Sequence, residues 1–148
     1  MSCPLHGTVK LAIRSSPAHL PIVRAAVESA CRLLGFDPET THGVVLSSDE
    51  ALANIIQHAY KGRDSQPIEV EIEPIGAGGQ QGIRLRLRDF GPSVDPSCIR
   101  PRDLDQVRPG GLGVHIISQH MDAVRYERAE GGGTLLTLEK TPPAPPKE

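Results

Sequence analysis

The stretch IEVEIEPIGAGGQQGIRLRLR, residues 68–88, decides the fold. In its two halves, aliphatic residues alternate with glutamates and then with arginines, and this period of two predicts a pair of β-strands. The glycine-rich run at 76–79 between them predicts a hairpin turn. The three glutamates of the first strand can pair with the three arginines of the second, while both aliphatic faces contact helices. The stretch therefore predicts an antiparallel ladder in a sheet that is covered on one face only.

Helical and strand periods predict the remaining elements. The expected strands lie at residues 8–14, 123–128 and 134–140, and the expected helices lie at 20–34, 37–60 and 114–121. Asp37 and Pro38 suit the N-cap and the first position of the second helix. The connection 90–109 is rich in Pro and Asp and has room for one short helix at 95–100. A connection of this length inside a compact domain is usually functional.

Together these elements predict the α+β class. The expected architecture is a two-layer α/β sandwich, with a mixed, mostly antiparallel sheet covered on one face by about three helices. A chain of 148 residues fits one compact domain, which we place at residues 1–140. The Pro-rich tail 141–148 is expected to be disordered.

The composition excludes several classes of function. Charged residues make up 23% of the chain and the net charge is −2, which argues against binding to nucleic acid. The chain has no Trp and two each of Tyr and Phe, too few for a base-stacking surface. Cys3, Cys31 and Cys98 are far apart and odd in number, so they predict neither a disulfide framework nor a zinc site. With no apolar run of signal-peptide or membrane-spanning length, we expect a soluble cytoplasmic protein without a membrane partner.

Candidate chemistry begins on the second helix. The run SSDEALANIIQHAY at 47–60 places Glu50 and Asn54 one turn apart, roughly 40° around the helix axis. The opposite side is apolar and consists of Val45, Leu52, Ile55, Ile56 and Ala59. An acid that accepts a proton and an amide oxygen that holds a hard cation are groups that a magnesium-dependent nucleotide enzyme requires. The same pattern is also typical of an ordinary amphipathic helix with a solvated face.

A second candidate motif, Asp89-Phe90-Gly91, ends a predicted strand. Its glycine would let a flat ligand approach the backbone while the Asp89 carboxylate accepts a hydrogen bond from that ligand. Asp-x-Gly is also a common turn at the end of a strand, so the motif alone does not identify a ligand.

A third motif, Gly110-Gly111-Leu112-Gly113, precedes the third helix. Bare backbone N–H groups at a helix start suit phosphate, although a flexible hinge has the same sequence. Arg108 lies just upstream and could add a positive charge against phosphate. Neither a P-loop nor a Rossmann glycine motif is present, so the commonest nucleotide-binding motifs are excluded.

The order of these motifs carries more information than any one of them. It runs Glu50-x-x-x-Asn54, Asp89-x-Gly91, Gly110-Gly111-x-Gly113 and then Thr134 in a late strand. This series resembles the GHKL (Bergerat-fold) ATPase superfamily of gyrases, chaperones and histidine kinases, over residues 8–140. Within it, the run 54–60 resembles the anti-sigma-factor serine kinases of bacterial partner-switching systems. Pro92 is a departure, because the superfamily often has a second glycine in this first glycine box; the stiffer turn leaves nucleotide affinity open.

The resemblance implies a role for each candidate residue. ATP and Mg²⁺ would be the cofactors, with Asn54 as the metal ligand and Glu50 as the general base. Asp89 would bind the adenine amino group, Gly91 would let the base sit close, and Thr134 would support adenine binding. Gly110, Gly111 and Gly113 would line the phosphates beneath a lid made from the long connection.

The resemblance implies a serine/threonine protein kinase that phosphorylates a small antagonist protein and sequesters a sigma factor or another output partner. The resemblance is also consistent with a homodimer. A second hypothesis is a regulatory binding module in which the nucleotide only shapes a docking surface; the presence of Glu50 favours the kinase. The catalytic module of a histidine kinase is less attractive, because no dimerisation helices with a phosphoacceptor His precede the domain.

Overall fold

The structure, a computed structural model of the chain, describes residues 5–76, 80–91 and 111–142. Five strands form one sheet in the order β1-β2-β3-β5-β4. They are β1 (Val9–Arg14), β2 (Pro67–Ile75), β3 (Gly82–Asp89), β4 (Ala123–Arg128) and β5 (Thr134–Lys140). Every neighbouring pair is antiparallel, so the expected mostly antiparallel sheet is antiparallel throughout its described part.

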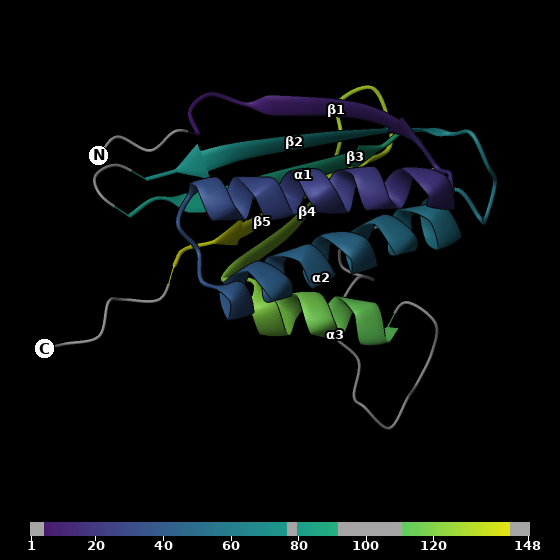
Figure 1. Cartoon of the computed structure of the whole chain (residues 1–148). Coiled ribbons are helices and arrows are strands. Elements are labelled where there is room, and N and C mark those ends of the chain that lie inside the picture. Colours follow the sequence, from purple (N-terminus) through teal and green to yellow (C-terminus); the bar gives the residue numbers. More distant parts are fainter. Residues whose placement is uncertain (1–4, 77–79, 92–110, 143–148) are drawn as a thin grey trace, which may run out of the picture.

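Three α-helices in the described residues cover one face of this sheet, as Figure 1 shows. They are α1 (Leu20–Leu33), α2 (Pro38–Asn54) and α3 (Gly111–His120), and a short 3₁₀ turn (Pro17–His19) precedes α1. The predicted start of α2 is confirmed, because the Asp37 carboxylate accepts a hydrogen bond from the Thr40 N–H at 2.8 Å. The two-layer α+β architecture is therefore the predicted one.

The central hairpin has the predicted register. Glu69, Glu71 and Glu73 lie opposite Arg88, Arg86 and Arg84 across the β2–β3 ladder. The pair Glu73–Arg84 closes at 3.1 Å and the pair Glu71–Arg86 at 3.7 Å. The third expected pair does not form.

Arg88 has other partners at the end of β3. It donates to the Glu130 carbonyl at 2.7 Å, and its guanidinium lies 4.5 Å from the centre of the Phe90 ring. Arg88 therefore bonds to the turn between β4 and β5 and not to Glu69, the residue opposite it on β2.

The core lies between the sheet and the helices and is mostly aliphatic. Its fully buried side chains include Val23 and Val27 of α1, Val44 and Leu52 of α2, and the inward residues of β2 and β3: Ile68, Val70, Ile72, Ile83, Leu85 and Leu87. Along these two strands the aliphatic residues point inward and the charged residues point outward, which explains the alternating sequence pattern.

Helix α2 departs from the expectation at its C-terminal end. It was expected to continue to Tyr60, but the α-helical part ends at Asn54 and a single π-helical turn, η2 (Ile55–Ala59), follows. The Tyr60 N–H accordingly bonds to the carbonyl of Ile55, five residues back. Such turns insert extra backbone into a helix and often occur at functional sites.

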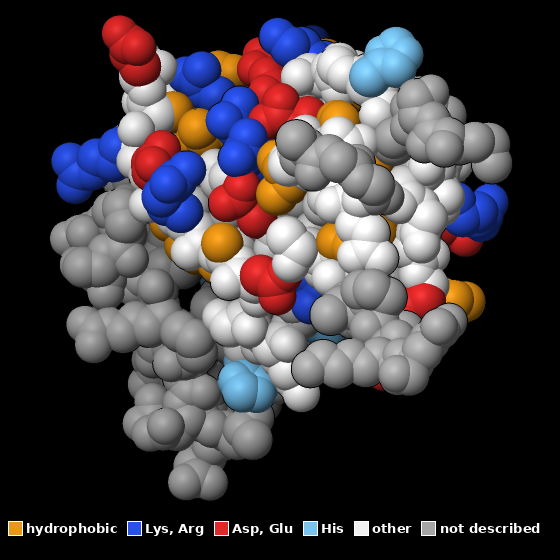
Figure 2. Space-filling model, turned by 90° about the vertical axis from the view of Figure 1, so that its left-hand side faces the viewer, with side chains coloured by type: hydrophobic (Ala, Val, Ile, Leu, Met, Phe, Trp, Pro, Cys, Tyr) orange, Lys and Arg blue, Asp and Glu red, His pale blue; other side chains and the backbone are white. Residues whose placement is uncertain are grey.

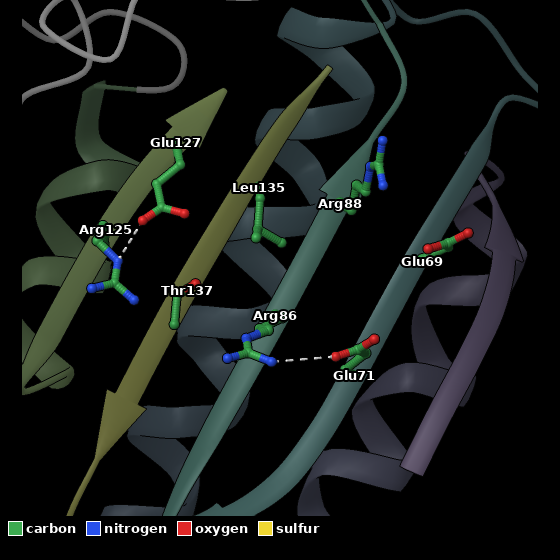
Figure 3. Close-up of a pocket in the computed structure, with 8 residues that line it drawn as sticks. All are labelled: Glu69, Glu71, Arg86, Arg88, Arg125, Glu127, Leu135 and Thr137. Carbon is green, nitrogen blue, oxygen red and sulfur yellow. Dashed lines mark ion pairs between the residues drawn. The ribbon is translucent and has the colours of Figure 1, made fainter. Parts of the chain in front are cut away.

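The outer face of the sheet carries charged side chains, several of which Figure 3 labels, and the three described helices lie on the opposite face (Figure 1). A shallow cavity of about 270 Å³ on this face is lined mostly by Glu69, Glu71, Arg86, Arg88, Arg125 and Glu127. Acidic and basic side chains are intermixed on the molecular surface that Figure 2 presents. Among the described residues, no helix combines the length and apolar character that crossing a membrane requires.

Candidate functional site

Asp89 is the last residue of β3, and its side chain is only 4% exposed. Its Oδ1 accepts the N–H of Gly91 at 3.1 Å. Burial raises the pKa of the Asp89 carboxyl above its ordinary 3.8, although hydrogen bonds from the Gly91 and Thr134 backbone and the charge of Arg88 oppose the shift. The strand end thus holds a buried acid whose carboxylate is oriented by backbone donors.

Thr134, the first residue of β5, lies next to this carboxylate and is 7% exposed. Its backbone contributes a hydrogen bond to Asp89, whereas its Oγ1 is buried without a hydrogen-bond partner among the described residues. A buried hydroxyl without a partner costs about 1–3 kcal/mol, so such groups are usually explained by a ligand or water. The carboxylate and the hydroxyl are the two polar groups that the sequence analysis assigned to one adenine ring.

Gly133 brings the start of β5 against the end of β3. A Cβ on this glycine would lie 2.0 Å from the Asp89 carbonyl oxygen and 2.9 Å from the Phe90 Cα, and its φ of +84° also favours glycine. The sequence alone did not predict this contact. A hairpin turn explains Gly131 to Gly133 equally well, and only the spatial neighbourhood of β3 distinguishes the last of them.

Gly91 contacts the turn that follows α2. A Cβ on Gly91 would lie 2.6 Å from the Ala59 carbonyl oxygen and 3.3 Å from the Ala59 Cβ. Gly91 is therefore required by close packing against η2, a role that is independent of the ligand approach expected from the sequence. This contact joins the Asp89-x-Gly91 motif to the helix that carries Glu50 and Asn54.

Glu50 and Asn54 occupy the last two turns of α2 and are partly exposed. Neither side chain forms a hydrogen bond or ion pair with another described residue, so both are available for a ligand. Their neighbour Asp49 is different, because it is held by Arg24 of α1 at 2.9 Å. The face of α2 with Glu50 and Asn54 is thus separate from the face that contacts α1.

Helix α3 supplies two of the four predicted phosphate-binding positions. The structure begins α3 at Gly111, so Gly111 and Gly113 form the first helical turn, three residues earlier than the expected start. Arg108 and Gly110 lie outside the described residues. At the other end of α3, His120 packs on Gly43 of α2, where a Cβ would lie 2.9 Å from the His120 Nδ1.

These groups fit an adenine nucleotide with a divalent cation. The buried carboxylate and the unpartnered Thr134 hydroxyl suit the hydrogen-bonding edge of a base, and the start of α3 suits phosphate. The described residues contain no group of three or more His, Cys, Asp or Glu side chains that could hold a metal ion. One amide, Asn54, together with phosphate oxygens fits Mg²⁺, which is commonly bound by few protein groups and substrate phosphates.

Comparison with known proteins identifies the protein family to which the chain belongs. Residues 13–140 match the histidine kinase-like ATPase domain, and the chain belongs to this family. The predicted resemblance to the GHKL superfamily is thereby confirmed.

Two relatives of this chain are named as protein kinases. The serine-protein kinase RsbW of Bacillus pumilus is 26% identical over 140 residues, which cover 87% of this chain and 83% of the relative. The serine/threonine-protein kinase BtrW of Bordetella bronchiseptica is 29% identical over 104 residues, 68% of this chain and 70% of the relative. The chain is therefore a distant relative of the RsbW serine kinases.

The fold is also similar to that of a solved structure, the RsbU and RsbW domains of Rv1364c from Mycobacterium tuberculosis. The TM-score is 0.62 at 17% sequence identity, and the match covers 93% of this chain but 34% of that larger one. This likeness supports the Bergerat-fold architecture of the sheet and helices.

Proposed function

We propose that this protein is a serine/threonine protein kinase of the RsbW type that uses ATP and Mg²⁺. The observation that carries the proposal is the buried Asp89 carboxylate, which accepts a hydrogen bond from the backbone of Thr134, together with the Thr134 hydroxyl, which is buried without a partner among the described residues. Membership of the histidine kinase-like ATPase family supports the same conclusion.

In this proposal, adenine binds at the joined ends of β3 and β5. Asp89 accepts a hydrogen bond from the 6-amino group, and Thr134 provides a second polar contact. Gly111 and Gly113 at the start of α3 contact the phosphates, with Arg108 and Gly110 as further phosphate-binding positions. Asn54 ligates the Mg²⁺, which neutralises charge on the phosphates when bound.

Glu50 acts as the general base in this proposal. It accepts the proton of a serine or threonine hydroxyl as that oxygen attacks the γ-phosphorus, and ADP leaves with the electron pair of the broken P–O bond. Glu50 lies one helical turn from Asn54 and forms no hydrogen bond or ion pair with another described residue, so its carboxylate is available for this step. A positioned base contributes about 10²- to 10⁴-fold to the rate.

The acceptor is proposed to be a small antagonist protein, with a sigma factor or another output protein as the alternating partner. The support is the relationship to RsbW and BtrW, whose names describe serine and serine/threonine kinases.

Two variants separate binding from transfer. We expect Glu50→Gln to keep the affinity for Mg-ATP within about threefold and to lower phosphoryl transfer by about 10²-fold or more. We expect Asp89→Asn to weaken ATP binding by about tenfold, because a neutral amide oxygen replaces the charged carboxylate as acceptor and the amide NH₂ cannot accept at all. Isothermal titration calorimetry with Mg-ATP measures the affinity of each variant. Transfer of labelled phosphate to acceptor proteins of a bacterial lysate measures phosphoryl transfer.

Glu71→Gln is the matched control, because this glutamate lies on the outer face of the sheet and should leave both quantities unchanged. Equal loss of binding in the Glu50 and Asp89 variants would contradict the assigned roles. Tight ATP binding by the wild type without any labelled acceptor would instead support a nucleotide-dependent binding module.

A further inference from the structure

Tyr60 joins three segments that meet at the candidate site. It directly follows η2, and its side chain is 2% exposed. Its hydroxyl accepts the N–H of Phe90 at 2.7 Å and donates to the carbonyl of Pro67 at the start of β2. One buried hydroxyl therefore connects the end of the α2 segment, the end of β3 and the beginning of β2.

The bond to Phe90 acts on the peptide next to Asp89. The Phe90 N–H belongs to the peptide unit that links Asp89 to Phe90, and the following N–H, that of Gly91, is the one that holds the Asp89 Oδ1. Rotation of the Asp89–Phe90 peptide would therefore displace the donor that orients the carboxylate. Contact between Gly91 and Ala59 fixes the same segment from the other side.

We infer that Tyr60 is a positioning residue for base recognition: its hydroxyl holds the Phe90 peptide so that the Asp89 carboxylate is aimed at the 6-amino group of adenine. This inference rests on the proposed function, in which Asp89 accepts a hydrogen bond from that amino group. Tyr60 itself does not touch the nucleotide. It acts through Asp89, and it ties the base-binding strand end to the helix that carries Asn54.

The test compares two nucleotides that differ only at the group in question. Tyr60→Phe removes the hydroxyl and keeps the ring. For this variant we expect the affinity for Mg-ATP to fall about five- to tenfold, which corresponds to one hydrogen bond. We expect the affinity for the Mg complex of purine riboside triphosphate, which lacks the 6-amino group, to change less than twofold, because Asp89 has no bond to lose there.

A purely structural role predicts a different result. Looser packing would weaken both nucleotides by the same factor, and such an equal loss, or no loss for either, would overturn the inference. Amide hydrogen exchange in the nucleotide-free protein gives an independent readout, since Phe90 should exchange faster in Tyr60→Phe than in the wild type.

Tyr126 provides the matched control, because it is the other tyrosine of the chain and its hydroxyl makes no hydrogen bond with a described residue. Tyr126→Phe should leave the preference for ATP over purine riboside triphosphate unchanged. A reduced preference in this variant would overturn the assignment to Tyr60.

A further variant covers the case in which Tyr60→Phe does not fold. Replacing Tyr60 by 3,5-difluorotyrosine, at a pH low enough to keep this more acidic phenol protonated, keeps the hydroxyl and the ring but makes the oxygen a weaker acceptor for the Phe90 N–H. A smaller preference for ATP supports the inference, and an unchanged preference overturns it. Failure of the wild type to bind ATP would refute the proposed function instead, so the two failures are distinguishable.

Discussion

Asp89 and Thr134 combine two features that disfavour the ligand-free state. Asp89 places an ionisable carboxyl in a buried position, and the Thr134 Oγ1 is buried without a partner among the described residues. Each feature carries a cost in free energy of folding unless a ligand or water compensates for it. A bound base with a donor and an acceptor on one edge would satisfy both groups at once.

The raised pKa of Asp89 predicts a pH-dependent contribution to stability. Because the folded-state pKa lies above 3.8, the stability that Asp89 contributes is fully present below pH 3.8 and is lost as pH rises through the folded-state pKa. We expect the free energy of unfolding of the wild type, minus that of Asp89→Asn, to decrease over this pH range and then level off. Denaturant unfolding without nucleotide, at several pH values, measures the difference.

Asp122 supplies a control of opposite sign. Partial burial opposes its ionisation, but hydrogen bonds from Thr141 and Lys140 outweigh this and lower the pKa of Asp122 below 3.8. Its contribution is therefore present above pH 3.8 and is lost as pH falls through the lowered pKa. A difference for Asp89→Asn that grows with pH, as it should for Asp122→Asn, would contradict the burial argument.

The sequence predicted the types of residue at the site better than their contacts. The family resemblance assigned Asp89 and Thr134 to one ligand, and the fold places the two residues together. Tyr60 lay within the quoted helix run without an assigned role, because its two hydrogen bonds join residues 7 and 30 positions away. Bonds of that range depend on how the elements pack, and no local pattern reports them.

At the scale of elements, the strands were predictable because burial alternates along them. The bounds of β4 and β5 are those expected from the sequence, and β2 and β3 alternate between buried and more exposed residues as their letters alternate. The end of α2 was not predictable in this way. A π-helical turn changes the backbone hydrogen-bonding register but needs no particular residue types. The position of this turn is fixed by the close contact between Ala59 and Gly91.

The turn between β4 and β5 allows a test of its contact with β3. Gly131 and Gly133 have nearly the same φ, +86° and +84°, but a Cβ would meet the Asp89 carbonyl at 2.0 Å only from Gly133. We expect Gly131→Ala to cost about 1–2 kcal/mol for the left-handed backbone. Gly133→Ala should cost about 1–3 kcal/mol more and should also weaken ATP binding. Thermal unfolding and nucleotide titration of both variants check this.

Equal effects of the two alanine substitutions would argue against a close approach of the turn to β3. The nearest atom to a Cβ on Gly131 is the Arg88 Nη2 at 3.8 Å, an ordinary contact, so Gly131→Ala isolates the backbone term.

At the scale of the whole molecule, the position of α3 depends on small residues of α2. Gly43, Ser47 and Ala51 recur every four residues and are buried, and the Ser47 hydroxyl bonds to the Gly43 carbonyl at 2.8 Å. His120 at the end of α3 lies directly on Gly43. Because α3 begins with Gly111 and Gly113, this contact would help to set the distance between the phosphates and Asn54 in the proposed function.

A double-mutant cycle tests that contact. Gly43→Ala gains about 1 kcal/mol of helix propensity but places a methyl group 2.9 Å from the His120 ring, so we expect a net loss of about 1 kcal/mol. In a His120→Ala background the ring atoms are gone and only the contact with the Cβ at 3.3 Å remains, so the same substitution should stabilise the protein by less than about 1 kcal/mol. Denaturant unfolding of the four proteins gives the coupling. The same sign of effect in both backgrounds would show that the helices adjust freely.

Two separate segments of the chain build the fold and the candidate site. The segment up to residue 91 supplies β1, β2, β3, α1 and α2, and the segment from residue 111 supplies α3, β4 and β5; the two meet along the β3–β5 ladder and at the α2–α3 contact. The proposed ligand groups come from both segments, with Glu50, Asn54 and Asp89 in one and Gly111, Gly113 and Thr134 in the other. An adenine nucleotide bound between them would act as a molecular glue, so that two separately made fragments of this chain would reassemble more tightly as its concentration rises.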